Sequence, residues 1–371
     1  MSVKIGKVRG INIKINYSWF LIFFFITWSL ANNYLPSQYP NKPNNFYWTI
    51  GLVSALSLYL SILVHELAHS AIAQGEGLEI NNITLHFFGG VSQIREESTN
   101  PKTESYMAIA GPLTSIVIGV LILAVNSILG SGLPDTFEAV LMYSGYVNLG
   151  LALFNLIPAY PMDGGRVLRA ILWNRNENLI KSTRTATSIA NIISLLFMGF
   201  GFFSIFSTGT LDGLWLVFIG LFINSSSKMG LSQTIISEAL GEMTVREIMT
   251  TEVKTVKPDV TIQEIIDDWF SVFKHQGYPV TENGELVGIV TLEDVRDVES
   301  DKRISVTVRD VMKKRDELII TNPDEKASDA LLKLATKNVG RLPVMENGTL
   351  VGILTRSDIS KTIQMKTEFQ S

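Results

Sequence analysis

Residues 63–69 read LVHELAH and end a long apolar run, so two histidines and a glutamate lie within one short stretch. On a helix, residues four apart share one face, and the imidazoles of His65 and His69 can therefore bind the same zinc ion. Glu66 is the residue type that acts as general base toward water at such a metal. The alternative is a histidine pair hydrogen-bonded to backbone at a membrane interface. The cost of placing ionisable groups at membrane depth disfavours it.

A catalytic zinc site needs a third protein ligand and an open position for water. The chain contains no cysteine, so this ligand must be His, Asp, Glu or a backbone group. Asp163 is the best candidate, because it follows an apolar run that Pro158 and Pro161 break. Irregular backbone at membrane depth persists only where it lines a cavity. The alternative role for Asp163 is N-cap of the next helix. A histidine pair that needs a third ligand favours the metal.

The elements that must position these residues are apolar and long. Only 18% of the residues are charged and the mean hydropathy is +0.25, whereas soluble chains carry about 25% charge. Five runs approach or exceed the roughly 20 residues of a membrane-spanning helix. A shorter aromatic run, 17–30, predicts a sixth span. The five are Trp48–Ala73, Met107–Leu129, Ala139–Ile157, Ile189–Phe206 and Gly213–Leu231.

Lysines and arginines are concentrated in the segments that six spans place on one side. The opposite loops contain only Lys42. Positive residues accumulate on the cytoplasmic side, which predicts a multi-pass cell-membrane protein with a cytoplasmic N-terminus and tail. The basic residues on that side are Lys4, Lys7, Arg9, Lys14, Arg95, Lys102, Arg166, Arg169, Arg175, Lys181 and Arg184.

Two segments of the membrane half predict β-structure. Residues 1–16 alternate apolar and polar, unlike a signal peptide, and predict a ribbon. Val3, Ile5, Ile11, Ile13 and Ile15 are expected on one of its faces. Ile80–Ile94 is too short to span a membrane and predicts a strand or hairpin.

The composition changes near Gly241–Met243, which predicts a membrane domain over 1–241 and a soluble module over 242–371. Residues 245–298 of this module recur as 308–362. Each repeat has an Asn-Gly hairpin turn between apolar strands, then T-x-x-D at the start of a helix. The net charge of −4 gives no general attraction to nucleic acid.

The H-E-x-x-H motif, followed about a hundred residues later by N-x-x-P-x-x-P-x-D-G-G, resembles the site-2 protease family of intramembrane zinc metalloproteases. The resemblance implies about six transmembrane helices with a small membrane-associated β-sheet, and cleavage of single-span transmembrane protein substrates within the lipid membrane. It implies that His65, His69 and Asp163 bind one Zn²⁺. Glu66 would move the proton, and Asn155 would hold the substrate or stabilise charge.

The repeats resemble a pair of CBS domains, at about 243–301 and 306–366, which form an α/β module. Such pairs often bind ATP, ADP or AMP, and they can form homodimers. The resemblance points to the motif residues Thr291, Asp294, Thr355 and Asp358. A hydroxyl at a helix N-terminus suits phosphate, and a carboxylate suits ribose hydroxyls. The alternative is that the threonines only cap helices.

Three further alternatives stay open at this stage. The strand over Leu85–Ile94 could pair with an unwound substrate by β-augmentation, or it could be a structural hairpin. His86 could be a fourth ligand, or an ordinary strand histidine. A CBS-regulated transporter or a non-catalytic membrane sensor are the competing functions. The transporter would need polar residues along several helices, and either would leave Glu66 without a role.

Overall fold

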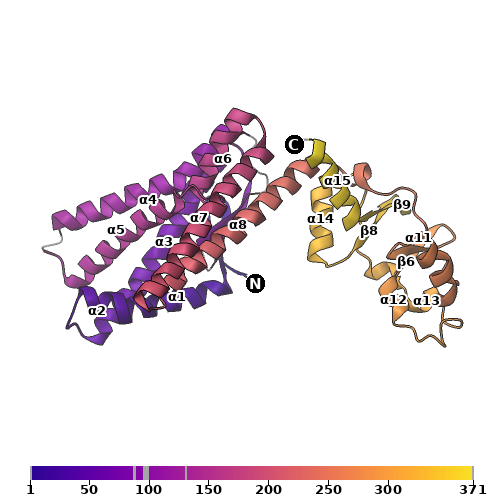
Figure 1. Ribbon diagram of the computed structural model, residues 1–371, viewed down its shortest axis with the longest axis horizontal. Helices are drawn as coiled ribbons and strands as arrows, with labels where there is room; N and C mark the ends of the chain where they lie inside the picture. The colour runs from indigo at the N-terminus through magenta and orange to yellow at the C-terminus, as the bar shows by residue number, and fades with distance from the viewer. Residues whose placement is uncertain (1, 87–88, 95–99, 130–131, 370–371) are drawn as a thin grey trace. The chain divides into compact units, whose positions relative to one another are not determined.

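The computed structural model describes residues 2–86, 89–94, 100–129 and 132–369. The chain divides into two compact units, Met1–Ser232 and Gln233–Ser371. The first consists mainly of long helices, and the second mixes short helices and strands (Figure 1).

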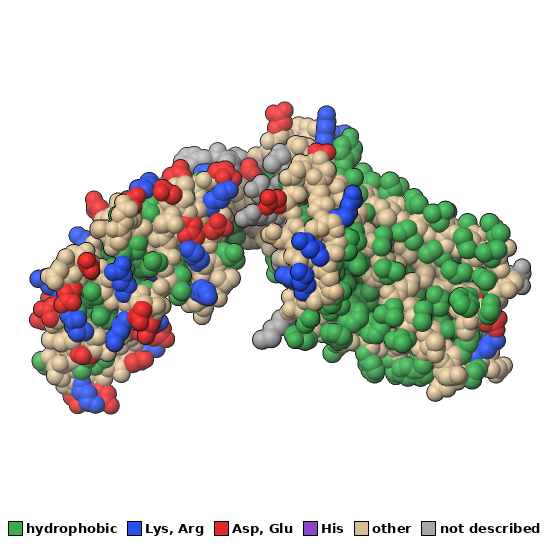
Figure 2. All heavy atoms as spheres, turned by 180° about the vertical axis from the view of Figure 1, so that it is seen from behind, with side chains coloured by type: hydrophobic (Ala, Val, Ile, Leu, Met, Phe, Trp, Pro, Cys, Tyr) green, Lys and Arg blue, Asp and Glu red, His purple; other side chains and the backbone are tan. Residues whose placement is uncertain are grey.

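Within the described residues, five helices are long and apolar enough to cross a membrane. Only 17–39% of the most apolar stretch of each is buried, so most of their surface is free to face lipid. On the face that Figure 2 shows, hydrophobic side chains cover the middle of the first unit, and charged side chains lie toward its ends. The five are α3 (Asn44–Gly75), α4 (Pro101–Leu129), α5 (Asp135–Asn155), α7 (Leu179–Thr208) and α8 (Gly213–Leu240).

The aromatic run predicted as a sixth span forms α1 (Tyr17–Ser29), a helix of 13 residues. The side chain of Asn16 caps it by accepting a hydrogen bond from the Ser18 N–H at 3.0 Å. A π-helical turn, η1 (Leu30–Tyr34), and α2 (Leu35–Gln38) continue the helical backbone. Because α1 alone is shorter than the roughly 20 residues of a spanning helix, its crossing stays a prediction.

A four-stranded sheet, in the order β1-β2-β3-β4, packs beside the second half of α3. Its buried side chains Ile11 and Ile13 belong to a hydrophobic core against which Leu63 and Leu67 of α3 pack. The middle pair of strands is parallel and the outer pairs are antiparallel, and within the described residues the outer edge of β4 is unpaired. The strands are β1 (Ser2–Val8), β2 (Ile11–Asn16), β3 (Ile80–His86) and β4 (Gly89–Ile94).

Both predicted β-segments are present, but one detail of the ribbon is wrong. A bulge between Lys4 and Gly6 shifts the register of β1, so Val3 pairs with Ile15 while Ile5 has no partner in β2. Simple alternation places Ile5 on the same face as Val3, and the extra residue of a bulge breaks that alternation. All of β1 is exposed, with Val3 at 46% and Ile5 at 57%, so exposure does not distinguish these two residues.

The helix after the proline-broken segment, α6 (Asp163–Asn176), begins at Asp163 itself, and Met162 is its N-cap. The alternative prediction that Asp163 is the N-cap is therefore wrong. The carboxylate instead occupies the first helical position, from which it points toward α3.

The second unit contains two copies of one folding pattern, each with its own apolar core. The hairpin turns are Asn283-Gly284 and Asn347-Gly348, and all four residues have positive φ, as a tight hairpin requires. The last turns of α8 pack with the second copy. The elements are α9 (Val245–Ile248), α10 (Ile262–Glu264), η3 (Ile265–Phe270), α11 (Ser271–Phe273), β5 (Gly277–Glu282), β6 (Glu285–Thr291), α12 (Leu292–Arg296), α13 (Val308–Val311), β7 (Lys313–Lys314), η4 (Arg315–Glu317), α14 (Ala327–Thr336), β8 (Arg341–Glu346), β9 (Thr349–Thr355) and α15 (Arg356–Phe369).

Candidate metal centre

Three metal-binding side chains converge between α3 and the start of α6. His65, His69 and Asp163 are all buried, and their ligand atoms lie within 4.8 Å of one another. Oδ2 of Asp163 is 3.1 Å from Nε2 of His65 and 3.3 Å from Nε2 of His69. Residues 98 positions apart in the sequence thus present their donor atoms to one point.

The donor set fits zinc. Nitrogen and oxygen ligands at about 2.0–2.1 Å from a tetrahedral zinc lie about 3.3 Å from each other, close to the spacing between Asp163 and the two imidazoles. Two neutral imidazoles and one carboxylate are also the ligand types of a catalytic zinc with an open position.

Helix α4 supplies a hydrogen-bond partner for Nδ1 of each imidazole. Nδ1 of His69 donates to the carbonyl of Met107 at 2.6 Å, and Nδ1 of His65 is 3.0 Å from Oγ of Ser115. Because a backbone carbonyl only accepts, Nδ1 of His69 carries the proton and Nε2 is free to bind a metal. Partners of this kind fix the orientation of metal-binding histidines.

The missing side chain of Gly111 on α4 leaves room next to the Nε2 atoms of both imidazoles. A Cβ there would lie 2.3 Å from Nε2 of His69 and 2.6 Å from Nε2 of His65. Only glycine can therefore occupy this position without displacing the two rings.

We predict that Gly111→Ala lowers zinc affinity about 10–100-fold, the usual effect of disturbing groups that orient metal ligands. The control is Gly150→Ala on α5, where a Cβ meets nothing within 4 Å. Zinc affinity is measured by competition with a chromophoric chelator. Equal affinity in both variants would show that Gly111 does not make room for the site.

Two glycines let the segment before Asp163 fold tightly over the first turn of α6. A Cβ on Gly164 would lie 2.1 Å from the carbonyl oxygen of Leu156, and one on Gly165 would lie 2.1 Å from the Tyr160 nitrogen. The close approach of the two backbones aims Asp163 at α3, so the D-G-G sequence has a direct structural reason.

Two known protein families match parts of this chain. Residues 53–139 and 131–201 match peptidase family M50, and residues 245–301 and 308–364 match the CBS domain. A zinc metalloprotease of Methanocaldococcus jannaschii is 31% identical over 98% of this chain and 96% of its own. The chain belongs to peptidase family M50. Rip3 of Mycobacterium tuberculosis is 30% identical over 98% of this chain and 93% of its own. The solved site-2 protease of Methanocaldococcus jannaschii covers 62% of this chain and 94% of its own, at 31% identity and a TM-score of 0.45.

Membership of family M50 settles the main predictions from the sequence. The protein is a zinc metallopeptidase with a helical membrane domain and a tandem CBS module, and the predicted fold class is confirmed. A transporter and a non-catalytic sensor are set aside.

The other residues predicted for this M50 peptidase lie as follows. Glu66 is half-buried and adjacent to His65 on α3. Asn155 is the last residue of α5, and its amide donates to the carbonyl of Leu151 in the same helix at 2.9 Å. His86 ends β3 and does not belong to the cluster of three metal-binding donors found in the described residues.

The structure also contains a buried ion pair in the M50 domain that was not predicted from the sequence. Nε of Arg169 on α6 donates to Oε1 of Glu104 on α4 at 2.7 Å, and a second guanidinium nitrogen contacts the same oxygen. Glu104 is fully buried, and it lies on the α4 face that carries Gly111 and Ser115. The spacing of these polar and small residues indicates a polar face on α4, but it does not identify Arg169 as the partner of Glu104.

In the CBS module, all four predicted residues cap helices. Oδ2 of Asp294 accepts hydrogen bonds from the N–H and hydroxyl of Thr291 at 2.8 and 2.6 Å. Asp358 does the same for Thr355 at 2.9 and 2.6 Å. The capping alternative thus describes their hydrogen bonds in this structure.

Thr291 also lines a cleft of about 610 Å³ in the CBS module. Its lining carries three basic side chains and two acidic ones, namely Arg296, Lys313, Arg341, Glu293 and Glu317. Burial lowers the pKa of the Arg341 guanidinium below its usual range, so an anion in this cleft would relieve a poorly solvated charge.

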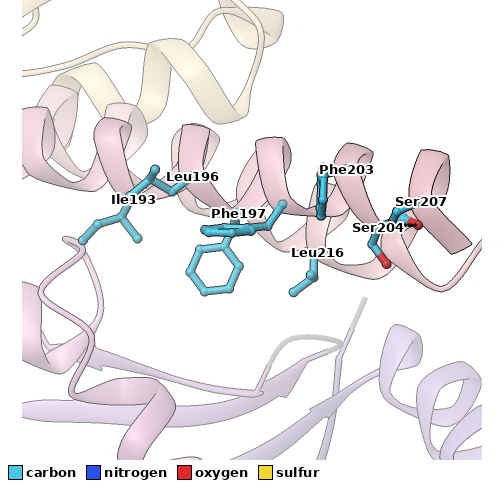
Figure 3. A pocket seen from close by; sticks show the side chains of 8 residues that line it. Ile193, Leu196, Phe197, Phe203, Ser204, Ser207 and Leu216 are labelled. Carbon is cyan, nitrogen blue, oxygen red and sulfur yellow. Dashed lines mark hydrogen bonds between the residues drawn. The ribbon is translucent and has the colours of Figure 1, made fainter.

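A second cavity of about 610 Å³ lies on α7 and α8 of the M50 domain (Figure 3). Its walls are apolar side chains of α7 with Leu216 of α8, and the polar groups among them are Ser204 and Ser207. Among the described residues, no ionisable or metal-binding side chain lines this cavity, so it is not a candidate for the hydrolytic site.

Proposed function

We propose that His65, His69 and Asp163 bind the catalytic zinc of an intramembrane protease, and that Glu66 is its general base. The observation that carries this proposal is the spacing of 3.1 and 3.3 Å between the carboxylate of Asp163 and the two imidazoles, in a buried site. Ionisable groups at membrane depth are costly, and a shared cation would offset that cost for these three buried side chains.

When bound, zinc lowers the pKa of water to about 7 and polarises the scissile carbonyl. Ser115 and Met107 hold the imidazoles in place, and Asp163 supplies the negative charge. Glu66 takes a proton from the attacking water and later gives it to the leaving amine, the usual role of this residue in the motif. Asn155, at the end of α5, would hold the substrate or stabilise charge.

The proposed substrate is a single-span transmembrane protein that unwinds locally to expose an amide. The chain has five long apolar helices in its described residues, with surface free to face lipid, which supports a substrate that arrives within the membrane. The unpaired outer edge of β4 could pair with the unwound segment, as β-augmentation requires. The distribution of lysines and arginines supports a cytoplasmic N-terminus and CBS tail.

Metal removal tests the hydrolytic mechanism. Treatment of the detergent-purified protein with a zinc chelator should stop cleavage of a single-span substrate, and about one equivalent of Zn²⁺ per chain should restore it. Cleavage is followed by the appearance of the shorter fragment on a gel. Cleavage that persists after zinc has been removed would contradict a zinc mechanism.

We also propose that the cleft at Thr291 binds ATP, ADP or AMP and that this modulates proteolysis. The cleft combines basic side chains with a helix N-terminus, and both attract phosphate. A homodimer through the CBS domains is a further proposal, which the mass of the detergent-solubilised protein tests.

Nucleotide at 100 times its Kd should stabilise the folded state by about 2.7 kcal/mol and raise the melting temperature of the CBS module. We predict that Thr291→Ala reduces this increase. Thr307→Ala is the control, because it removes the same kind of cap at a helix outside the cleft and should leave the increase unchanged. No increase with any of the three nucleotides would contradict the proposal.

A further inference from the structure

We propose that the buried ion pair between Glu104 and Arg169 positions Asp163 for metal binding, through contacts with Tyr160. This inference rests on the proposed zinc site. It assigns a role in that site to three residues that are not themselves metal ligands.

The contacts of Arg169 connect the chain segments before and after Asp163 to α4. Arg169 lies on α6, the helix that Asp163 begins, and its Nη1 donates to the hydroxyl of Tyr160 at 3.0 Å. Its guanidinium also lies 4.8 Å from the centre of the Tyr160 ring. Tyr160 belongs to the segment that leads into Asp163, so one guanidinium holds the backbone before the ligand and the helix after it.

Glu104 completes the connection. It lies one turn before Met107, whose carbonyl orients His69, and on the same helix as Ser115, which orients His65. Helix α4 therefore sets both imidazoles directly and sets Asp163 through the ion pair. All three proposed ligands are aligned on one element.

Stability alone does not explain this pair. Glu104 is fully buried and Arg169 is 5% exposed. Buried ion pairs are often no more stable than apolar side chains of similar size, because both charges lose their hydration. Within the described part of the chain, Oε2 of Glu104 has no hydrogen-bond partner, which adds to that cost. A pair that is poor for stability and connects the ligand-bearing elements fits a positioning role.

The close packing of Tyr160 supports the same role. A Cβ on Gly230 of α8 would lie 2.6 Å from the Tyr160 ring, so the ring has no room to move on that side. Arg169 contacts it from α6. The tyrosine is thus held between two helices, and the backbone that carries Asp163 is fixed with it.

The test compares the double variant Glu104→Met/Arg169→Met with wild type. Replacing both charges avoids a lone fully buried charge, and Arg166, which lies 3.9 Å from Glu104, is partly exposed to solvent, so the metal-free protein should melt within a few degrees of wild type. Zinc affinity, measured by chelator competition, should fall about 10–100-fold. The visible absorption spectrum of the cobalt-loaded protein should also change, because the geometry around the metal changes.

Two further variants keep the test decisive. Tyr160→Phe removes only the hydroxyl contact and should weaken zinc binding by about 10-fold, the lower end of the range for groups around the ligands. Arg175→Met changes an exposed arginine of the same helix and should leave zinc affinity and the cobalt spectrum unchanged. If the double variant does not fold, Tyr160→Phe alone decides.

Different results would refute the positioning role of the ion pair and the zinc site itself. Wild-type zinc affinity and an unaltered cobalt spectrum in the double variant and in Tyr160→Phe would show that the pair is only structural, and would overturn the inference. Zinc binding by wild type that does not respond to Asp163→Ala would instead reject the zinc site itself. Weakened zinc binding with an unchanged metal-free melting temperature would support the positioning role.

Discussion

Replacement of Glu66 by glutamine will abolish peptide hydrolysis while the zinc stays bound. Glutamine has nearly the same shape, but it cannot accept a proton from the attacking water. Loss of a general base lowers rates by about 10²–10⁴-fold, so cleavage of a single-span substrate should fall by at least that range. Because Glu66 is not one of the three clustered donors, zinc content should remain about one per chain.

Glu177→Gln provides the matched control for this prediction, since it makes the same chemical change at an exposed position after α6. It should cleave at the wild-type rate. Cleavage rates and zinc content are measured on the same preparations, which separates chemistry from metal loss. Glu66→Gln with wild-type cleavage would refute the proposed role of Glu66.

Asp163→Ala will lose zinc and activity together. The two histidines remain, but two ligands hold zinc far more weakly than three, so we expect affinity to fall by more than the roughly 10–100-fold that follows loss of a supporting group. Metal analysis after dialysis should find zinc in wild type and little in the variant. Hydrolysis should be lost to the same extent.

Asp135→Ala is the control for Asp163→Ala. Asp135 is likewise the first residue of a helix, so both variants lose a favourable charge at a helix N-terminus, worth about 0.3–1 kcal/mol. The control should keep zinc and activity. Retention of zinc by Asp163→Ala would mean that another group is the third ligand.

The sequence reveals those parts of the site that depend on local spacing. His65 and His69 share a helix face because they are four residues apart, and no tertiary information is needed to see it. Asp163 was predictable from the prolines before it, which place irregular backbone next to an acid at membrane depth.

Other parts of the site depend on distant contacts and could not be predicted. The pairing of Glu104 with Arg169 joins residues 65 positions apart on two helices, and neither helix alone shows it. Gly111 shares a face of α4 with Glu104 and Ser115, but the sequence alone does not show that this face meets the two imidazoles. Its importance appears only when α3 and α4 pack together.

The fold shows the same division. Long apolar runs and the internal repeat predicted the helices and the CBS pair, because each signal extends over many residues. The bulge that displaces Ile5 depends on one extra residue in β1, and alternation alone cannot locate it.

Anomalous X-ray scattering at the zinc absorption edge, from crystals of the intact protein, would test the zinc site most directly. We predict one peak in the membrane unit, about 2.0–2.2 Å from Nε2 of His65, Nε2 of His69 and a carboxylate oxygen of Asp163. A zinc ion bound elsewhere, or one that leaves Asp163 uncoordinated, would contradict the proposed site and the hydrolytic mechanism built on it.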